Sequence, residues 1–392
     1  MARTITVGID IGTYHVRVVV AEIVKERDKA NPRIIGTGFA ESKGLRHGYI
    51  INSGEVTRAI KTAVRQAEKA SGIEIKRAYL SIGGIGLAGN TAQGSVVITK
   101  ADSEITDLDI NKVLEACENE LPQSLSMNRK IIHAIPIAYK IDGKQVLGRP
   151  QGMRGMRLEV RMLFITSLEQ HLNDLIQAVA DAEIEVEDVM ASPLAASLVT
   201  LTKAQKIAGC VLANIGAETV SIAVFENNIP ISLEVFPIGS TDITHDIALG
   251  FKIPLDEAEK LKLGHTTDSS YPKKKLDEII LARMSDIFEL IDAHLKKIGR
   301  NELLPAGIII TGGGSAISSI EDIAKAALKL PSKIAAFTFE SSSRLNLQDS
   351  TWAVAYGLCI LGFTQGSEPS MGLKLMGKTK NSVLSWIKQF LP

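Results

Sequence analysis

The sequence is poor in cysteine, carries no excess of charge of either sign and lacks a long hydrophobic run. Its three cysteines, Cys117, Cys210 and Cys359, are too far apart for a zinc site or a disulfide framework, so we expect buried thiols. Lysine and arginine total 44, as do aspartate and glutamate, which argues against a dedicated nucleic-acid-binding protein. The longest apolar run, residues 352–363, is shorter than the ~20 residues of a membrane-spanning helix, and residues 1–4 lead into a strand pattern rather than a signal segment. We therefore expect a cytoplasmic protein of about two or three domains.

Two β-hairpins with similar glycine-containing turns are predicted roughly two hundred residues apart. β-Branched runs at 5–10 and 16–21 flank the first turn, and runs at 210–213 and 220–225 flank the second. Backbone N–H groups in such turns form concavities that bind phosphate. A carboxylate at Asp10 suits Mg²⁺, which is usually held through water. The predicted phosphate contacts are Gly12, Thr13 and Tyr14 in the first turn, and Asn214, Gly216, Ala217, Glu218 and Thr219 in the second.

A third glycine loop follows a predicted strand at 307–311 and leads into a predicted helix at 320–328. Its residues Gly312, Gly313, Gly314 and Ser315 are predicted to hold a base and ribose through their backbone. A single loop of this kind often has only a structural role. The set does not fit a Walker loop or a dinucleotide fingerprint, because both require a helix directly after the glycines, whereas the first two turns return to strands.

Periodicity and capping residues predict the elements between these loops. We expect a glycine-rich stretch at 83–94, a loop at 147–157 and mostly helical structure over 239–304. The predicted helices are 53–71, 106–120, 169–182, 193–201 and 274–298, and the predicted strands are 77–82, 96–99, 130–141, 157–166 and 186–190.

The three loops together resemble those of the actin-like ATPase superfamily. Its members also use a glutamate and a lysine, three residues apart on a helix, to contact the ribose and base. Glu259 and Lys262 within 256–262 fit that spacing, although a solvated pair on an exposed helix is the alternative. The resemblance implies an α/β fold of the actin-like (ribonuclease H-like, duplicated) type, with two lobes around a nucleotide cleft that binds ATP and Mg²⁺.

Within the superfamily, the sequence is similar to the FtsA family of bacterial cell-division proteins over about residues 4–363. Residues 132–139, 152–159 and 243–248 carry the similarity. It implies an FtsA-type inserted subdomain. The expected division is a first lobe core (1–83 and 163–194), the inserted subdomain (84–162), a second lobe core (195–238 and 305–364), a helical subdomain (239–304), a flexible linker (365–381) and a terminal amphipathic helix (382–392).

Two positions depart from the superfamily pattern for catalysis. The second hairpin turn begins with Asn214 where the superfamily usually has aspartate, and Ser192-Pro193 stands where filament ATPases often have Glu-Pro. Phosphoryl transfer relies on neutralising phosphate charge and on positioning the attacking water. We therefore expect ATP binding with weak or absent hydrolysis, and we name no catalytic residue.

The C-terminal segment is predicted to be an amphipathic helix. Its apolar residues recur at helical spacing, lysines precede it, and residues 369–392 contain no acid. A helix docked on the core of its own chain is the alternative. Such a segment suits an anionic membrane surface, and the family resemblance implies the same. The predicted membrane residues are Val383, Leu384, Trp386, Ile387, Lys388, Phe390 and Leu391.

The resemblance implies a protein of the division site on the cytoplasmic face of the inner membrane. Such a protein forms actin-like homopolymers and tethers the tubulin-like protein FtsZ to the membrane, among other division proteins. The FtsZ C-terminal peptide is expected to dock on residues 239–304, with Arg283, Lys296, Lys297 and Arg300 as candidate contacts. The alternatives are a PilM-like ATP-binding protein of pilus assembly, a small-molecule kinase of the same superfamily and a chaperone-like ATPase. A chaperone-like ATPase would need a separate substrate-binding domain, and the predicted domains leave no residues for one.

Overall fold

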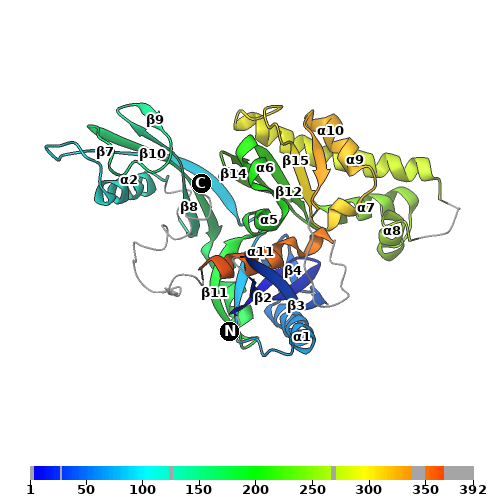
Figure 1. The fold of residues 1–392 in the computed structure, drawn as a ribbon. Coiled ribbons are helices and arrows are strands. Elements are labelled where there is room, and N and C mark those ends of the chain that lie inside the picture. The colour runs from blue at the N-terminus through cyan, green and yellow to red at the C-terminus, as the bar shows by residue number, and fades with distance from the viewer. Residues whose placement is uncertain (1–3, 27–28, 123–126, 266–270, 337–348, 366–392) are drawn as a thin grey trace.

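Two five-stranded sheets with the same topology form the framework of the protein (Figure 1). The structure is a computed structural model that describes residues 4–26, 29–122, 127–265, 271–336 and 349–365. In each sheet an antiparallel three-stranded meander continues into two parallel strands. The first sheet contains β1 (Thr4–Ile11), β2 (His15–Glu26), β3 (Lys29–Glu41), β6 (Arg77–Ile82) and β11 (Glu185–Ala191). The second contains β12 (Cys210–Ile215), β13 (Val220–Glu226), β14 (Ile229–Phe236), β15 (Ile308–Thr311) and β16 (Ser332–Ile334).

Both predicted hairpins are confirmed, but the third strand of each meander was not predicted. Strand β3 contains Pro32, Gly36 and Gly38, and glycine and proline lower β-propensity, so its sequence carries little strand signal. The predicted helix 53–71 is α1 (Ser53–Ser71). It begins where the Asn52 side chain accepts a bond from the Glu55 N–H.

The helices α5 (Ser192–Thr200) and α11 (Ala353–Gln365) lie between the two sheets at the centre of Figure 1. Helix α11 packs on β1 and α5, which explains the long apolar run: Leu358 and Leu361 are fully buried. All three cysteines are buried free thiols, as predicted. The first sheet is also covered by α4 (Glu169–Ala180), and the short elements are α6 (Lys203–Ala208), β4 (Leu45–Arg46), β5 (Tyr49–Ile50), η1 (Gly313–Ala316) and η2 (Ser350–Trp352).

A separate four-stranded antiparallel sheet projects to one side of the molecule (Figure 1). It contains β7 (Ala88–Val97), β8 (Arg129–Ile141), β9 (Lys144–Val146) and β10 (Arg157–Leu168), and α2 (Asp107–Asn119) packs on it. The prediction of a strand starting only at residue 96 is wrong, because most of the glycine-rich stretch belongs to β7. A Cβ at Gly94 would lie 2.5 Å from the main-chain nitrogen of Cys117, so glycine lets α2 approach the strand closely.

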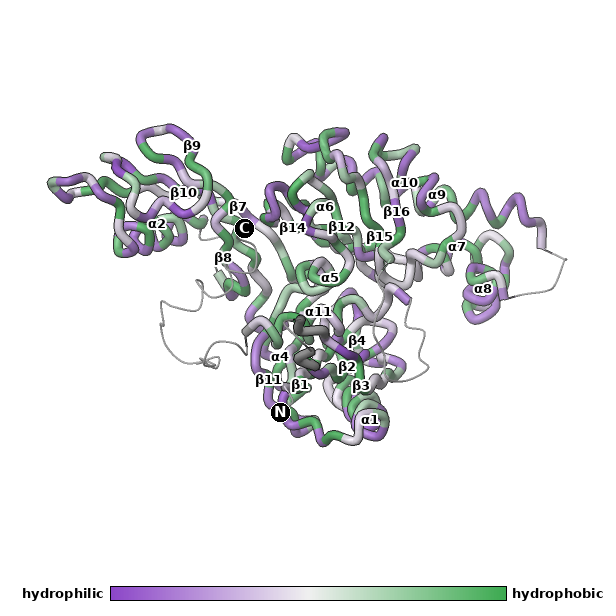
Figure 2. Tube along the Cα trace, in the orientation of Figure 1, coloured by the Kyte–Doolittle hydropathy of each residue, from purple (hydrophilic) through white to green (hydrophobic). Residues whose placement is uncertain are grey.

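Three helices flank the second sheet on the side opposite the inserted sheet: α7 (Ser240–Phe251), α8 (Leu255–Lys262) and α9 (Lys273–Lys297). Helix α10 (Ile320–Leu328) packs beside α9. The predicted apolar stripe of α9 faces the core, where Met284, Ile287 and Ile291 are fully buried. Figure 2 shows that α8 and the outer end of α9 are hydrophilic, while the central strands are hydrophobic.

No helix within the described ranges is long and apolar enough to cross a membrane. The predicted membrane residues and nearly all of the predicted linker fall in 366–392, outside the described residues.

Candidate functional site

A cavity with a volume of about 470 Å³ lies between the two five-stranded sheets. Both hairpin turns, the third glycine loop and helix α8 contribute to its wall. The lining includes nearly all residues that the sequence predicted to bind nucleotide or metal: Asp10, Gly12, Thr13, Tyr14, Asn214, Gly216, Ala217, Thr219, Glu259, Lys262, Gly312, Gly313 and Gly314. Segments more than three hundred residues apart in the sequence therefore meet at one site.

The first turn places a carboxylate at the cavity. Asp10 has part of its surface open to the cavity, and the Ser81 hydroxyl donates a 2.7 Å hydrogen bond to it. Enclosure by protein raises the pKa of Asp10, an effect that the Ser81 bond and the Arg17 charge only partly offset. A carboxylate that faces a cavity in this way is suited to a hydrated divalent cation. No cluster of three metal-ligating side chains occurs among the described residues, so a cation here would depend on water and phosphate for its other ligands.

The second turn is held in place from its own lobe. The Gly216 N–H donates to the Thr219 carbonyl at 2.9 Å, and the first amides of α7, at Ser240 and Thr241, donate to the carbonyls of Gly216 and Ala217. These bonds fix the path of the turn around the cavity. A turn held in one conformation in this way is suited to binding an anion through its backbone N–H groups.

Two predicted contacts do not line the cavity. The Glu218 carboxylate accepts a hydrogen bond from the main-chain N–H of His47 in the first lobe. Ser315 is buried, donates to the Gly312 carbonyl at 2.7 Å and pairs with Ser350 Oγ at 2.8 Å. Ser315 therefore stabilises the third loop through buried hydrogen bonds and does not face the cavity.

The third loop requires glycine at its first position. Gly312 has φ +88°, and a Cβ there would lie 2.3 Å from Asn214 Oδ1. Glycine alone combines that φ with so close an approach to the second hairpin. The conformation of the loop thus requires glycine at position 312, and Gly312, Gly313 and Gly314 line the cavity. That this loop holds a base and ribose stays a prediction.

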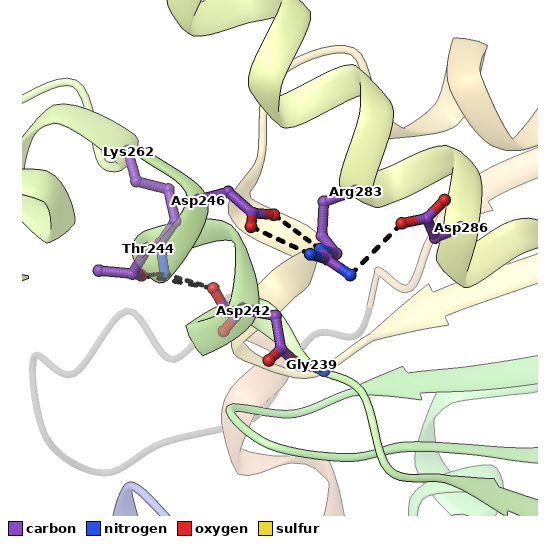
Figure 3. Close-up of polar contacts among 8 residues, drawn as sticks. Gly239, Asp242, Thr244, Asp246, Lys262, Arg283 and Asp286 are labelled. Atoms are coloured by element: carbon purple, nitrogen blue, oxygen red, sulfur yellow. Dashed lines mark hydrogen bonds and ion pairs between the residues drawn. The ribbon is translucent and has the colours of Figure 1, made fainter. Parts of the chain in front are cut away.

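Glu259 and Lys262 form an ion pair of 2.7 Å on α8. Lys262 also donates to the Ser240 carbonyl at 3.1 Å and to Thr244 Oγ1 at 2.9 Å, and its side chain is only 5% exposed. Figure 3 shows Lys262 and Thr244 on neighbouring helices, next to Asp242, which caps α7 by accepting from the Gly239 N–H. The pair is therefore not a freely solvated one; it lies at the cavity wall, bound to the start of α7.

Arg17 is a cavity residue that the sequence reasoning missed. It faces Asp10 across the β1–β2 hairpin, and burial lowers the pKa of its guanidinium. Its guanidinium carbon lies 5.8 Å from the centre of the Trp352 ring. The available signal was a single arginine within the β-branched run 16–21, since a charge in an otherwise buried strand usually has a specific role.

The first lobe adds four more missed residues, Gly48, Gly83, Gly84 and His171, and it brings to the cavity Ser192, which the sequence analysis names as a departure from the superfamily pattern. The Ser192 hydroxyl donates to the Ile82 carbonyl at 3.0 Å, so it is already engaged. The carboxylates that line the cavity are Asp10, Glu259 and Asp349, and Glu259 is paired with Lys262.

Three of the predicted partner residues lie on α9 and Arg300 lies just after its end, and all four interact with acids of the same chain. Arg283 is bound bidentately by Asp246 on α7 and also contacts Asp286 (Figure 3). Arg300 is paired with Glu226, and Lys296 with Asp292 at 2.6 Å. The charge of Lys297 acts on Glu234.

Comparison with known proteins identifies the family. A model described as "Cell division protein FtsA" matches residues 211–357, and a model of the SHS2 domain inserted in FtsA matches residues 84–166. The cell division protein FtsA of Bacillus subtilis is 30% identical over 373 residues, which cover 90% of this chain and 82% of the relative. The chain belongs to the FtsA family of cell-division proteins. FtsA of Neisseria meningitidis is 31% identical over 345 residues, 82% of this chain and 81% of the relative.

Solved structures establish the fold of this FtsA-family member. A protein of the PilM–PilN type IV pilus biogenesis complex aligns with a TM-score of 0.68 at 16% identity, covering 93% of this chain and 99% of that one. MreB5 of Spiroplasma citri bound to ADP aligns with a TM-score of 0.51 at 13% identity, covering 92% and 96%. The predicted actin-like fold with an FtsA-type inserted domain is confirmed.

Proposed function

We propose that this protein binds ATP with Mg²⁺ in the cleft between its lobes, polymerises, and links FtsZ to the cytoplasmic face of the membrane at the division site. One observation carries the ATP proposal. Two phosphate-type turns, a carboxylate, a glycine loop and the Glu259–Lys262 pair all line one cavity. The resemblance of the fold to MreB5, which is ADP-bound in its structure, supports the same ligand class.

In this proposal each part of the cavity has a separate task. The turn backbone at Gly12–Thr13 and Gly216–Thr219 binds the phosphates, and Gly312–Gly314 together with Glu259 and Lys262 binds the nucleoside. Asp10 fits Mg²⁺ through water, because its carboxylate faces the cavity with one protein hydrogen bond, from Ser81. Mg²⁺ would neutralise phosphate charge there.

Hydrolysis should be weak for reasons visible in the cavity. Asn214 cannot supply a negative charge, and the Ser192 hydroxyl is bonded to the Ile82 carbonyl. Positioning of the attacking water normally uses a hydrogen-bond acceptor aimed at it. We infer that ATP acts mainly as a bound ligand that favours assembly.

Membrane attachment and partner binding rest on the sequence and on family membership. The amphipathic segment 382–392 is the proposed anchor, and many copies in a polymer would raise avidity without new contacts. Residues 239–304 are the proposed docking region for the FtsZ C-terminal peptide. Arg283 and Arg300 are weaker candidates than Lys296 and Lys297, because each arginine already donates two hydrogen bonds to one carboxylate, Asp246 and Glu226 respectively.

The PilM-like function is the second candidate, since a structure of a PilM–PilN complex aligns over nearly the whole chain. Its identity of 16% is well below the 30% of the Bacillus subtilis FtsA. The amphipathic C-terminal segment, which the PilM-like alternative does not account for, favours the division function.

Isothermal titration of the purified chain with ATP and Mg²⁺ tests the ATP proposal. We expect saturable binding that weakens when EDTA removes Mg²⁺ and that is lost in a Gly312→Val variant. Absence of binding to the folded wild-type chain would reject the proposal. The Gly143→Val variant is the matched control and should still bind, because Gly143, in the β8–β9 turn of the inserted sheet, also has positive φ but no neighbouring atom within 4 Å of an added Cβ.

A further inference from the structure

The two lobes are joined next to the cavity by a reciprocal contact between His47 and Glu218. The main-chain N–H of His47 donates to the Glu218 carboxylate, and His47 Nδ1 lies 3.1 Å from the main-chain oxygen of Glu218. His47 belongs to the turn between β4 and β5 in the first lobe. Glu218 belongs to the second phosphate-type turn, 171 residues further along the chain. Each side chain therefore bonds to the backbone of the other residue.

Both ends of this contact are attached to the cavity wall. On the first lobe, the His47 carbonyl accepts from the Ile85 N–H at 3.1 Å, and the adjacent Gly48 lines the cavity. On the second lobe, Ala217 and Thr219 flank Glu218 and line the cavity. The contact thus spans the end of the cleft where the first lobe meets the second turn.

The geometry at both residues indicates a constrained arrangement. His47 has φ +48°, a left-handed conformation that is uncommon for a residue with a side chain. A carboxylate on a turn that binds phosphate would repel the ligand if it faced the cavity. The Glu218 carboxylate does not line the cavity, and it accepts a charge-assisted hydrogen bond from the main-chain N–H of His47 in the opposite lobe.

We propose that the His47–Glu218 contact holds the lobes closed over the phosphate end of the cleft and sets the rate at which bound nucleotide leaves. The Glu218 carboxylate is then a positioning group that does not itself touch the nucleotide. This inference rests on the proposed ATP site. Breaking the contact should leave the binding surface intact while lowering the barrier to opening, so the dissociation rate should change more than the association rate.

The test compares Glu218→Ala and Glu218→Gln with wild type in the full chain. Release of a fluorescent ATP analogue with Mg²⁺ is followed by stopped-flow after a chase with excess ATP. We expect about tenfold faster release for Glu218→Ala, since a hydrogen bond to a charged group is lost, and a smaller change for Glu218→Gln, whose amide oxygen still accepts. His47→Gly removes the imidazole, tolerates the positive φ, and should also speed release. Glu185→Ala, which removes an exposed surface carboxylate paired with Arg77, is the matched control and should be unchanged.

Hydrogen exchange of the His47 amide in the nucleotide-free chain gives an independent readout. We expect faster exchange in Glu218→Ala than in wild type. The two proteins should have equal unfolding temperatures, so that the faster exchange reports local opening. Release rates within twofold of wild type, a loss of affinity that comes from slower association, or equal exchange at His47 would each overturn the inference. If wild type binds no nucleotide, the proposed function fails, whereas the exchange comparison still decides whether the contact holds the lobes.

Discussion

Asp10 is the residue at which stability and ligand binding are most directly opposed. Its pKa is raised because protein encloses the carboxylate on the sides away from the cavity. A raised folded-state pKa means that its contribution to stability is fully present below the ordinary aspartate pKa and is lost as pH rises through the folded value. At neutral pH the ionised group therefore destabilises the nucleotide-free protein, and a bound cation would relieve that penalty.

Asp10→Asn should separate these two effects. We expect a higher unfolding temperature than wild type at pH 7 without ligand, and a difference that vanishes at pH values below the ordinary aspartate pKa. With Mg²⁺ and ATP present, the same variant should bind about tenfold more weakly, since it loses a charged partner of the cation. Thermal scans across pH and titrations with and without EDTA measure both. A variant with a lower unfolding temperature and unchanged Mg²⁺ dependence would contradict this account of Asp10.

Gly312 offers a second test at the residue scale. Gly312→Ala should destabilise the fold by about 1–3 kcal/mol, because it adds a positive-φ penalty to a collision with Asn214. Gly299→Ala, at φ +67° with open space around it, should show only the φ penalty of about 1 kcal/mol. Urea unfolding of the two variants measures the difference. Equal losses of unfolding free energy in the two variants would mean that residue 312 does not lie close to Asn214 in solution.

At the scale of elements, helix α7 connects the cavity to the outer helices. Its first amides bind the second turn, Thr244 on its next turn bonds to Glu259 and Lys262, and Asp246 then binds Arg283 on α9. A change at the second turn thus has a continuous physical route to α9. The route consists of polar contacts between helices, which the sequence pattern of any one helix does not reveal.

The Asp246–Arg283 pair should contribute to the docking of α7 on α9. Both side chains are about 30% exposed, so we expect Arg283→Ala to cost about 1 kcal/mol of unfolding free energy. Lys296→Ala, which breaks a more exposed pair within α9, should cost under about 0.5 kcal/mol. A double-mutant cycle with Asp246→Ala isolates the coupling. A coupling energy near zero would show that the bidentate Asp246–Arg283 pair contributes no net stability.

The C-terminal segment is the second element with a separable role. Deletion of residues 382–392 should abolish co-sedimentation with anionic vesicles while leaving ATP binding unchanged, because the apolar face and its neighbouring lysines supply the membrane affinity. Neutral vesicles serve as the control for the electrostatic part. Undiminished sedimentation of the truncated chain with anionic vesicles would reject the anchor.

At the scale of the whole molecule, local patterns predicted most of the architecture. Both hairpins, helix α1 and the third glycine loop were predictable, because alternation, caps and glycine turns act over a few residues. The strand β7 was not, since its glycines serve contacts outside the strand itself: Gly94 lies against Cys117 of α2, and Gly89 lies against Leu233 of β14. The same limit applies within the cavity. Its glycine turns could be identified in the sequence, but the outward direction of Glu218 depends on His47, and the pairing of Arg283 depends on Asp246, each from a distant segment.

Electron microscopy of the full chain on anionic lipid monolayers tests the central claim most directly, with and without ATP and Mg²⁺ and then with FtsZ added. The account predicts filaments on the lipid that depend on ATP, persist without rapid ATP turnover and recruit FtsZ. Lipid-bound protein that forms no filaments with ATP, or filaments that fail to recruit FtsZ, would contradict it.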